Sequence, residues 1–306
     1  MTGGTGFAGT HLIELLLDGH PIVHAWSNPA GRSARHDNPR VHWRAVNLLD
    51  RETIAREIAS VRPSAVYHCG GVADVSASWT RPARALQVNT LGTCYLLDAV
   101  RHAELDCPVL VTGSALVYQP SRDPLTEDSA IGPASPYGLS KLAQEMMASR
   151  AASTPAIVAR PFNHAGPGQS DAYVTSSLAR QIAEAETGVG EPVLRVGNLD
   201  SRRDITDVRD TVQAYVLLVE HGRPGRPYNV CSGRAYAVKD LLTMLIGMSS
   251  VALRVEADPE RMRPSDNPVV LGDNSRIREE AGWSPRIPIE QTLTDLLAYW
   301  RVRIRA

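Results

Sequence analysis

The sequence has little net charge and no long hydrophobic run. Its 306 residues carry a formal net charge of −1, which gives no electrostatic reason to expect binding to nucleic acid or to an anionic membrane. No apolar stretch approaches the roughly 20 residues needed to span a bilayer. The first residues lack the basic segment and apolar core of a signal peptide. We therefore expect a cytoplasmic protein without a membrane or nucleic-acid partner.

The sequence is also poor in cysteine. Its four cysteines, Cys69, Cys94, Cys107 and Cys231, form no CxxC pair and have no spacing typical of a metal site. Three of them lie in apolar stretches, as reduced core residues do. The content of hydrophobic residues (43%) and of charged residues (21%) is that of an ordinary globular protein. We predict no metal site, and composition alone indicates no function.

Short β-type runs alternate with amphipathic helical runs over the first 160 residues. Strands are predicted at residues 22–26, 41–46, 65–69, 109–112 and 156–160, and helices at 10–18, 51–60, 84–103 and 136–152. This alternation predicts an α/β fold with a doubly wound parallel sheet covered by helices on both faces. After residue 162 the pattern loosens into loops rich in Gly, Pro and Asn, which indicates a smaller C-terminal lobe.

A glycine cluster opens the chain. Gly3, Gly6 and Gly9 have the spacing GxxGxxG and lead directly into the predicted helix at residues 10–18. Glycines at this spacing let the backbone turn tightly and approach a pyrophosphate, while the helix N-terminus offers free N–H groups. A plain turn would also use glycine, but the βα pattern that follows favours phosphate binding.

A strand should precede such a glycine turn, and here it has almost no residues. In a dinucleotide-binding unit that strand is buried in the middle of the sheet. We therefore expect the first strand to be missing from this chain. We also expect the natural protein to begin roughly 5 to 10 residues earlier, with a short β-branched run of typical strand length.

Three residues in the middle of the chain could transfer a proton. Tyr137 and Lys141 lie four positions apart in a predicted helix and therefore share one face. A nearby ammonium group lowers a tyrosine pKa, which suits a group that exchanges a proton with a carbonyl or alcohol. Ser114 follows a predicted strand and precedes Tyr118 by four residues. The alternatives are a surface Tyr–Lys pair and a serine that caps the strand end.

Together these motifs resemble the extended short-chain dehydrogenase/reductase family. Its pattern is TGxxGxxG, then Ser or Thr four residues before a tyrosine, then YxxxK, and this chain has all three in that order. The resemblance implies a Rossmann-type NAD(P)-binding domain. It implies that Ser114 hydrogen-bonds the substrate oxygen and that Tyr137 transfers the proton. It also implies that Lys141 lowers the tyrosine pKa and holds the nicotinamide ribose.

The resemblance also implies a set of cofactor-binding residues. They are Gly3, Thr5, Gly6, Phe7, Gly9, Ser27, Asn28, Arg32, Asn47, Leu48, Tyr137, Lys141, Phe162 and His164. NAD enzymes usually carry an acid at the end of the second strand, where this chain has Trp26. Because Arg32 and Arg35 follow, a 2′-phosphate and hence NADPH is favoured, with NADH possible. The alternative is a loop whose arginines face water.

The second half of the chain resembles enzymes that act on GDP-6-deoxyhexoses. The resemblance rests on RPFNHAGPGQ at residues 160–169, VGNLDSRRDITDVRD at 196–210 and RPSD at 263–266. It implies the substrate-binding residues Asn163, Val174, Asn198, Arg203 and Arg263. A guanidinium group suits a diphosphate because it offers paired donors, although a solvated surface arginine is the alternative. We predict an NADP-binding domain at 1–163, rejoined by 207–230, and a sugar-nucleotide lobe formed by 164–206 and 231–306.

The two residues that follow Ser114 help to identify the reaction. Related 4,6-dehydratases carry an acid pair where this chain has Ala115 and Leu116, and neither side chain can move a proton. The resemblance therefore implies reduction of the C4 ketone of GDP-4-dehydro-6-deoxy-D-mannose by NAD(P)H to GDP-D-rhamnose. An epimerase or reductase of another nucleotide sugar is the alternative, and a GDP-mannose 4,6-dehydratase is disfavoured.

A protein of a different class, a non-catalytic dinucleotide-binding regulator, would have little need for Ser114, Tyr137 and Lys141 together. The predicted helices at 84–103 and 136–152 have apolar faces that resemble the family's dimer interface, so a homodimer is expected. A role for these faces in the core explains them equally well.

Overall fold

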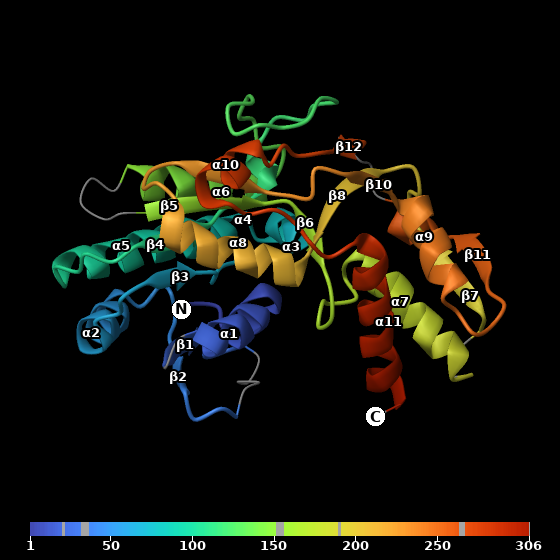
Figure 1. Cartoon of the computed structure of the whole chain (residues 1–306), viewed down its shortest axis with the longest axis horizontal. Helices are drawn as coiled ribbons and strands as arrows, with labels where there is room; N and C mark the ends of the chain where they lie inside the picture. The colour runs from blue at the N-terminus through green and yellow to red at the C-terminus, as the bar shows by residue number, and fades with distance from the viewer. Residues whose placement is uncertain (20–21, 32–36, 151–155, 189–190, 263–266, 306) are drawn as a thin grey trace.

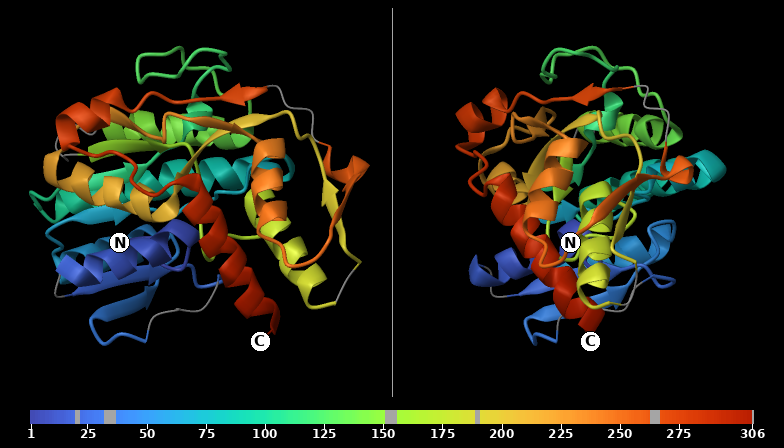
Figure 2. Two further views of the ribbon diagram at one scale, coloured as in Figure 1. Left: turned by 45° about the vertical axis from the view of Figure 1, so that its right-hand side comes forward. Right: turned by 90° about the vertical axis from the view of Figure 1, so that its right-hand side faces the viewer.

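The computed structural model of the chain describes residues 1–19, 22–31, 37–150, 156–188, 191–262 and 267–305. A parallel sheet with helices on both faces forms the larger part of the molecule, and a smaller group of helices and short strands lies beside it (Figures 1 and 2). None of the described helices is long and apolar enough to cross a bilayer. The predicted cytoplasmic location stays a prediction.

The main sheet contains all of the strands expected from the sequence. Its strands are β1 (Val23–Ser27), β2 (Val41–Ala45), β3 (Val66–His68), β4 (Val109–Thr112), β5 (Ala156–Pro161) and β9 (Pro227–Val230). Every pair within it is parallel, with β1 beside β2 and the order β3-β4-β5-β9 in the other part. The predicted α/β fold with a parallel sheet is therefore confirmed.

The place of the expected first strand lies between β1 and β3. Thr2 forms isolated parallel bridges with Trp26 on one side and His68 on the other. The Thr2 N–H donates to the Tyr67 carbonyl at 2.9 Å, and the Trp26 N–H donates to the Met1 carbonyl at 2.9 Å. The expected strand is therefore reduced to a bridge at Thr2, which joins the two parts of the sheet. The expectation of a longer run upstream stays a prediction.

Helices cover the sheet because alternate residues of its strands point to opposite faces. Leu110 of β4 packs with α1 (Phe7–Gly19) and α8 (Val208–His221), whereas Val109 and Val111 pack with α2 (Arg51–Val61) and α5 (Gly92–His102). Both faces are thus buried, which explains why the strands have nearly continuous apolar sequences.

The helix predicted at residues 84–103 is one continuous run with a change of pitch. It consists of α4 (Pro82–Leu86), a π-helical turn η1 (Gln87–Leu91) and α5. The helix predicted at 136–152 is α6 (Pro136–Ser149), whose N-terminus is capped by Ser135. Single π-turns occur frequently at functional sites because they reorient a side chain.

The smaller lobe has its own hydrophobic core. The core is formed by α7 (Val174–Glu186), α9 (Val238–Gly247) and α11 (Ile289–Arg305), together with the strands that they cover. Strands β6 (Asn163–Ala165), β7 (Val193–Val196), β8 (Arg202–Asp207) and β10 (Ala235–Ala237) contribute residues to this core, whereas β11 (Arg254–Ala257) extends it only by pairing with β7, and β12 (Val269–Val270) pairs with β8. The remaining short helices, which are divided between the two parts of the molecule, are α3 (Val75–Thr80), η2 (Ala115–Val117), η3 (Pro259–Arg261) and α10 (Ser275–Ala281).

The chain passes between the two parts more than once. After β8 it returns to the main sheet through α8 and β9, and α10 packs into the core of that sheet as well. Trp283 is buried there, and its indole N–H donates to the Asp210 carbonyl at 2.9 Å. The domain boundaries proposed from the sequence stay a prediction.

Candidate active site

The glycine turn forms a cradle at the start of α1. Gly3 has φ +69, and a Cβ atom there would lie 2.7 Å from the backbone nitrogen of Gly70. A Cβ atom at Gly9 would lie 2.1 Å from the Gly3 carbonyl oxygen, so α1 packs directly on the turn. Only glycine tolerates these approaches. The N-terminus of α1 therefore lies where free N–H groups can meet a phosphate.

Ser114, Tyr137 and Lys141 come together at the start of α6. The side chains are nearly buried, with exposed fractions of 7%, 8% and 5%. The Ser114 hydroxyl group hydrogen-bonds the phenol of Tyr137, and the Lys141 ammonium lies 6.0 Å from the centre of the tyrosine ring. The Tyr137 N–H donates to the Ser78 hydroxyl group at 3.1 Å, which fixes the first turn of α6 against α3. The predicted catalytic residues thus share one site.

The pKa of Tyr137 differs from the sequence-based expectation. Burial raises the pKa of Tyr137 to about 12, and the hydrogen bond from Ser114 only partly opposes this rise. Burial also lowers the pKa of Lys141 to about 8. The net shift of the Tyr137 pKa is upward because desolvation of the phenolate outweighs the hydrogen bond from Ser114, and the expected effect of Lys141 on the tyrosine stays a prediction. At neutral pH the tyrosine is a neutral proton donor and the lysine is charged.

Two residues predicted to bind the cofactor stack on each other. The rings of Phe7 and His164 lie 5.6 Å apart and are parallel to within 6°. His11 contacts the edge of Phe7 and hydrogen-bonds the Pro167 carbonyl at 2.8 Å. Burial lowers the pKa of His164, so its ring is neutral. These contacts connect the start of α1 with the segment after β5, which also contains the buried Phe162.

Other predicted cofactor residues lie at the carboxyl ends of β1 and β2. Ser27 is half-buried, while Asn28 and Asn47 are exposed. Leu48 packs against Gly70 and Gly92 beneath the glycine turn. Because parallel strands end at one edge of the sheet, these residues share an edge with the glycine turn.

Trp26 does not occupy the position that the sequence suggested. Its side chain is 5% exposed and packs in the core under α2, so it cannot face a ribose. The half-buried Ser27, next along the strand, is the residue at that edge. The sequence placed the acid of NAD enzymes at the position of Trp26, and the burial of Trp26 contradicts that placement. Arg32 and Arg35 lie outside the described residues.

The predicted substrate residues lie in the smaller lobe. Asn163 of β6 is exposed and pairs with Ile205 of β8, the strand that also contains Arg203. The Arg203 guanidinium donates to the Pro268 carbonyl at 3.3 Å, and burial lowers its pKa. Val174, 41% exposed, begins α7.

Tyr173, the residue before α7, raises the pKa of Tyr137, although less than burial does. Asn198 follows β7, and its side chain accepts a hydrogen bond from the Asp200 N–H at 3.0 Å. Within the described part of the chain, Asn198 makes no hydrogen bond to Tyr137. Arg263 lies outside the described residues.

Several polar residues around Lys141 were not found from the sequence. The Lys141 ammonium donates to the Thr112 carbonyl at 2.8 Å and to the Gln144 side-chain oxygen at 2.9 Å. Asn89, in the π-turn, donates to the Ser140 hydroxyl group at 2.8 Å. Thr112 and Asn89 lie far from Lys141 in sequence, and Gln144 lies on the same helix but outside the YxxxK motif. The segment NTLGT at residues 89–93 is the one signal that could have directed attention to the π-turn.

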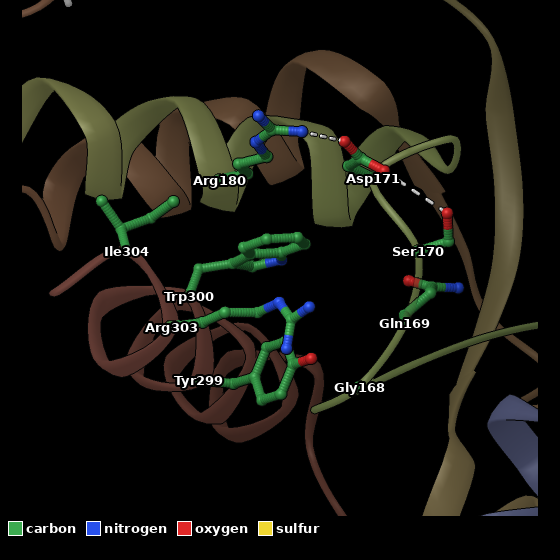
Figure 3. Close-up of a pocket in the computed structure, with 9 residues that line it drawn as sticks. All are labelled: Gly168, Gln169, Ser170, Asp171, Arg180, Tyr299, Trp300, Arg303 and Ile304. Atoms are coloured by element: carbon green, nitrogen blue, oxygen red, sulfur yellow. Dashed lines mark hydrogen bonds and ion pairs between the residues drawn. The ribbon is translucent and has the colours of Figure 1, made fainter. Parts of the chain in front are cut away.

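A separate pocket of about 340 Å³ lies between α7, α11 and residues 168–171 (Figure 3). Figure 3 shows Arg180 directed toward Asp171 and lying near the Trp300 ring. Arg180 also pairs with Glu184, so its charge is already balanced by carboxylates. Among the described residues, the pocket lining includes none of the predicted site residues. It is therefore not the site derived from the sequence.

Comparisons with known proteins identify the family. The chain matches the family model described as GDP-mannose 4,6 dehydratase over residues 1–296. It is 35% identical to the GDP-6-deoxy-D-mannose reductase of Pseudomonas aeruginosa, over 100% of this chain and 97% of the relative. It is 27% identical to the GDP-mannose 4,6-dehydratase of Vibrio cholerae serotype O1, over 97% of this chain and 92% of the relative.

A solved structure shows the same fold. The structure of RMD from Pseudomonas aeruginosa complexed with NADPH matches with a TM-score of 0.85 and 33% identity, covering 99% of this chain and 98% of that chain. Family model, relatives and structure thus agree over nearly the whole length. The chain belongs to the GDP-mannose 4,6-dehydratase family of extended short-chain dehydrogenases/reductases, as its motifs predicted.

Proposed function

We propose that the protein uses NADPH to reduce the C4 ketone of GDP-4-dehydro-6-deoxy-D-mannose to GDP-D-rhamnose. The observation that carries this proposal is the site itself. Ser114, Tyr137 and Lys141 lie together, while Ala115 and Leu116 occupy the positions of the dehydratase acid pair. The relative named GDP-6-deoxy-D-mannose reductase supports the choice of substrate, because it aligns over the whole of this chain.

The protein's own residues account for the proton. Ser114 would hydrogen-bond the ketone oxygen, which orients it beside the phenol of Tyr137. Since the pKa of Tyr137 is raised to about 12, the phenol holds its proton at neutral pH and donates it as negative charge develops on the oxygen. The charged Lys141 then stabilises the phenolate electrostatically. Bound NADPH would supply the hydride to C4.

The glycine cradle fits a dinucleotide cofactor. The close backbone approaches at Gly3 and Gly9 bring the start of α1 onto the glycine turn, where the free N–H groups of the helix could meet a pyrophosphate. Gly3, Thr5, Gly6, Phe7 and Gly9 would hold the pyrophosphate, and Lys141 and Tyr137 the nicotinamide ribose. The choice of NADPH over NADH is supported by the relative solved with NADPH and by the lack of an acid at residues 24–28.

We also propose that the protein forms a homodimer through the outer face of α6 and of the helical run that contains η1. Leu139, Met146 and Met147 of α6 are 49%, 41% and 46% exposed, and Leu91 beside them is 43% exposed. Residues 139 and 146 are seven positions apart, so they lie on one side of the helix. Large apolar side chains gathered on one helix face indicate a protein interface.

The function is tested with a GDP-4-keto-6-deoxy-D-mannose substrate prepared by a dehydratase. We expect NADPH consumption at a 1:1 ratio with a new GDP-deoxyhexose, whose proton NMR spectrum should show the axial hydrogen at C4 of GDP-D-rhamnose; an equatorial hydrogen would identify the C4 epimer instead. The same preparation should leave UDP-glucose and GDP-mannose unchanged. Epimerisation of UDP-glucose without NADPH consumption would instead identify the alternative, a nucleotide-sugar epimerase.

A further inference from the structure

The Lys141 ammonium is held by two carbonyl oxygens. It donates to the Thr112 backbone at 2.8 Å and to the Gln144 side chain at 2.9 Å, and Gln144 is completely buried. An ammonium has three N–H donors. Two are therefore engaged within the described part of the protein, and one is left for the side where Tyr137 lies.

Thr93 decides which way the Gln144 amide points. The Thr93 hydroxyl group has one proton, which it donates to the Asn89 carbonyl at 2.7 Å. It can therefore only accept from Gln144, whose amide nitrogen lies 2.9 Å away. With its NH₂ group facing Thr93, the amide must turn its oxygen toward Lys141. A flipped amide would place two donors against the ammonium and leave Thr93 without this donor.

His68 and Thr2 extend the same chain of hydrogen bonds to the glycine turn. His68 Nε2 lies 2.8 Å from the Thr93 hydroxyl group, and His68 Nδ1 lies 2.8 Å from the Thr2 hydroxyl group. Because Thr93 has no second proton, Nε2 carries the proton and Nδ1 accepts from Thr2. The Gly70 N–H then donates to the same Thr2 oxygen at 2.8 Å. All the side chains of this chain are at most 5% exposed.

We propose that Gln144 is a positioning residue for the reaction: its amide, oriented by Thr93, holds the Lys141 ammonium so that the third N–H faces the cofactor and Tyr137. This inference rests on the proposed function, because the proposed effect on the pH profile requires that Tyr137 transfers a proton with the help of Lys141. It adds a residue that the YxxxK motif does not contain. The buried amide acts through Lys141 and does not touch the substrate.

The titratable groups around Lys141 carry no charge at neutral pH, so the carbonyl oxygens of Thr112 and Gln144 are the main contacts that stabilise its ammonium. Cys69 and His68, from β3 and the residue after it, act on Lys141 electrostatically, and Tyr137 faces it from α6. Burial raises the pKa of Cys69 to about 12 and lowers that of His68 to about 3. All three are therefore neutral at pH 7. A change at residue 144 should thus act directly on the protonation of Lys141.

Two substitutions with opposite electrostatics test the proposal. Gln144→Met keeps the approximate volume and removes the oxygen, whereas Gln144→Glu keeps the shape and adds a negative charge. The pH profile of kcat/KM reports the groups of the free enzyme. We expect Gln144→Met to move the alkaline limb down and Gln144→Glu to move it up, each by about one pH unit. We also expect Gln144→Met to lower kcat roughly tenfold or more, because Lys141 loses its fixed position.

Thr93 and Thr90 provide a matched pair on the same helical run. Thr93→Val removes the hydroxyl group that orients the Gln144 amide. The alkaline limb of its kcat/KM profile should therefore move in the same direction as the limb of Gln144→Met. The Thr90 hydroxyl group lies 3.5 Å from the Ser140 carbonyl and does not contact Gln144 or Lys141 within the described residues. Thr90→Val should therefore keep the wild-type profile.

The results separate this inference from the proposed function. If Tyr137→Phe is inactive and both Gln144 variants keep the wild-type kcat and profile, the role of Gln144 is overturned while the reaction stands. Shifts of both variants in the same direction overturn it as well. If Gln144→Met does not fold, the direction of the shift in Gln144→Glu decides. An unmodified protein that does not reduce the GDP-keto sugar refutes the proposed function instead.

Discussion

Arg160 and Glu145 form a buried two-point ion pair that fastens α6 to β5. The Arg160 Nε atom donates to one carboxylate oxygen at 2.9 Å, a second guanidinium nitrogen donates to the other oxygen, and both side chains are less than 10% exposed. Arg160 also donates to the Tyr118 hydroxyl group at 2.7 Å. Glu145 follows Gln144 directly, so this pair helps fix the helix that holds the catalytic residues.

Replacing Glu145 should therefore destabilise the fold. In Glu145→Gln the Arg160 charge stays buried without its counter-charge, so the free energy of unfolding should fall by about 3–5 kcal/mol. Urea unfolding followed by circular dichroism measures this change. Glu184→Gln, which removes one carboxylate from the more exposed Arg180, is the control and should cost less than about 1 kcal/mol. Equal small losses would contradict a structural role for the Arg160–Glu145 pair.

Tyr137→Phe should lower kcat by about two to four orders of magnitude, because the phenolic proton is needed in the transition state. The dissociation constant of NADPH, measured by fluorescence, should stay within about fivefold of the wild-type value. Turnover close to normal would show that Tyr137 is not the proton donor.

Activity should depend on pH through Lys141. The ammonium is protonated below its pKa, which burial lowers to about 8, so kcat/KM should be level below pH 8 and decline above it. The decline has this sign because deprotonation removes the charge that stabilises the phenolate. Lys141→Arg should keep reduced activity but lose the decline near pH 8, since a guanidinium keeps its charge. A decline unchanged in Lys141→Arg would assign it to another group.

The protein should not dehydrate GDP-mannose. With Ala115 and Leu116 in place of the acid pair, incubation with GDP-mannose and NADP should give no 6-deoxy-4-keto product by mass spectrometry. Leu116 is 38% exposed beside Ser114, so Leu116→Glu introduces a carboxylate without filling the core. We expect slow dehydration in that variant. Substantial dehydration by the unchanged protein would contradict the assignment as a reductase.

The proposed dimer predicts a clear effect of charge on α6. Met146→Glu should convert the dimer into a monomer in light scattering coupled to size-exclusion chromatography, because two buried carboxylates would face each other across the interface. Val302→Glu on α11, where the side chain is 71% exposed, is the matched control and should leave the mass unchanged. A monomeric wild-type protein would contradict the dimer.

The sequence determined the elements and the order of the motifs. The strands of the main sheet follow from short apolar runs such as Val109–Thr112, and α6 follows from its apolar periodicity and from Pro136 at its start. Such signals are local, because neighbouring residues set both the backbone preference and the apolar face. The spacing of Tyr137 and Lys141 is local in the same way. The sequence alone therefore indicated the fold and the candidate catalytic residues.

Only the tertiary structure decided the properties that depend on burial and on distant partners. The sequence suggested a lowered pKa for Tyr137, but the folded chain buries the phenol and raises it. Trp26 was expected at the ribose and instead packs in the core. The contacts from Thr2 through His68 and Thr93 to Gln144 join four separate segments of the chain. Desolvation and buried hydrogen bonds depend on all the surrounding elements at once, so a local pattern cannot encode them.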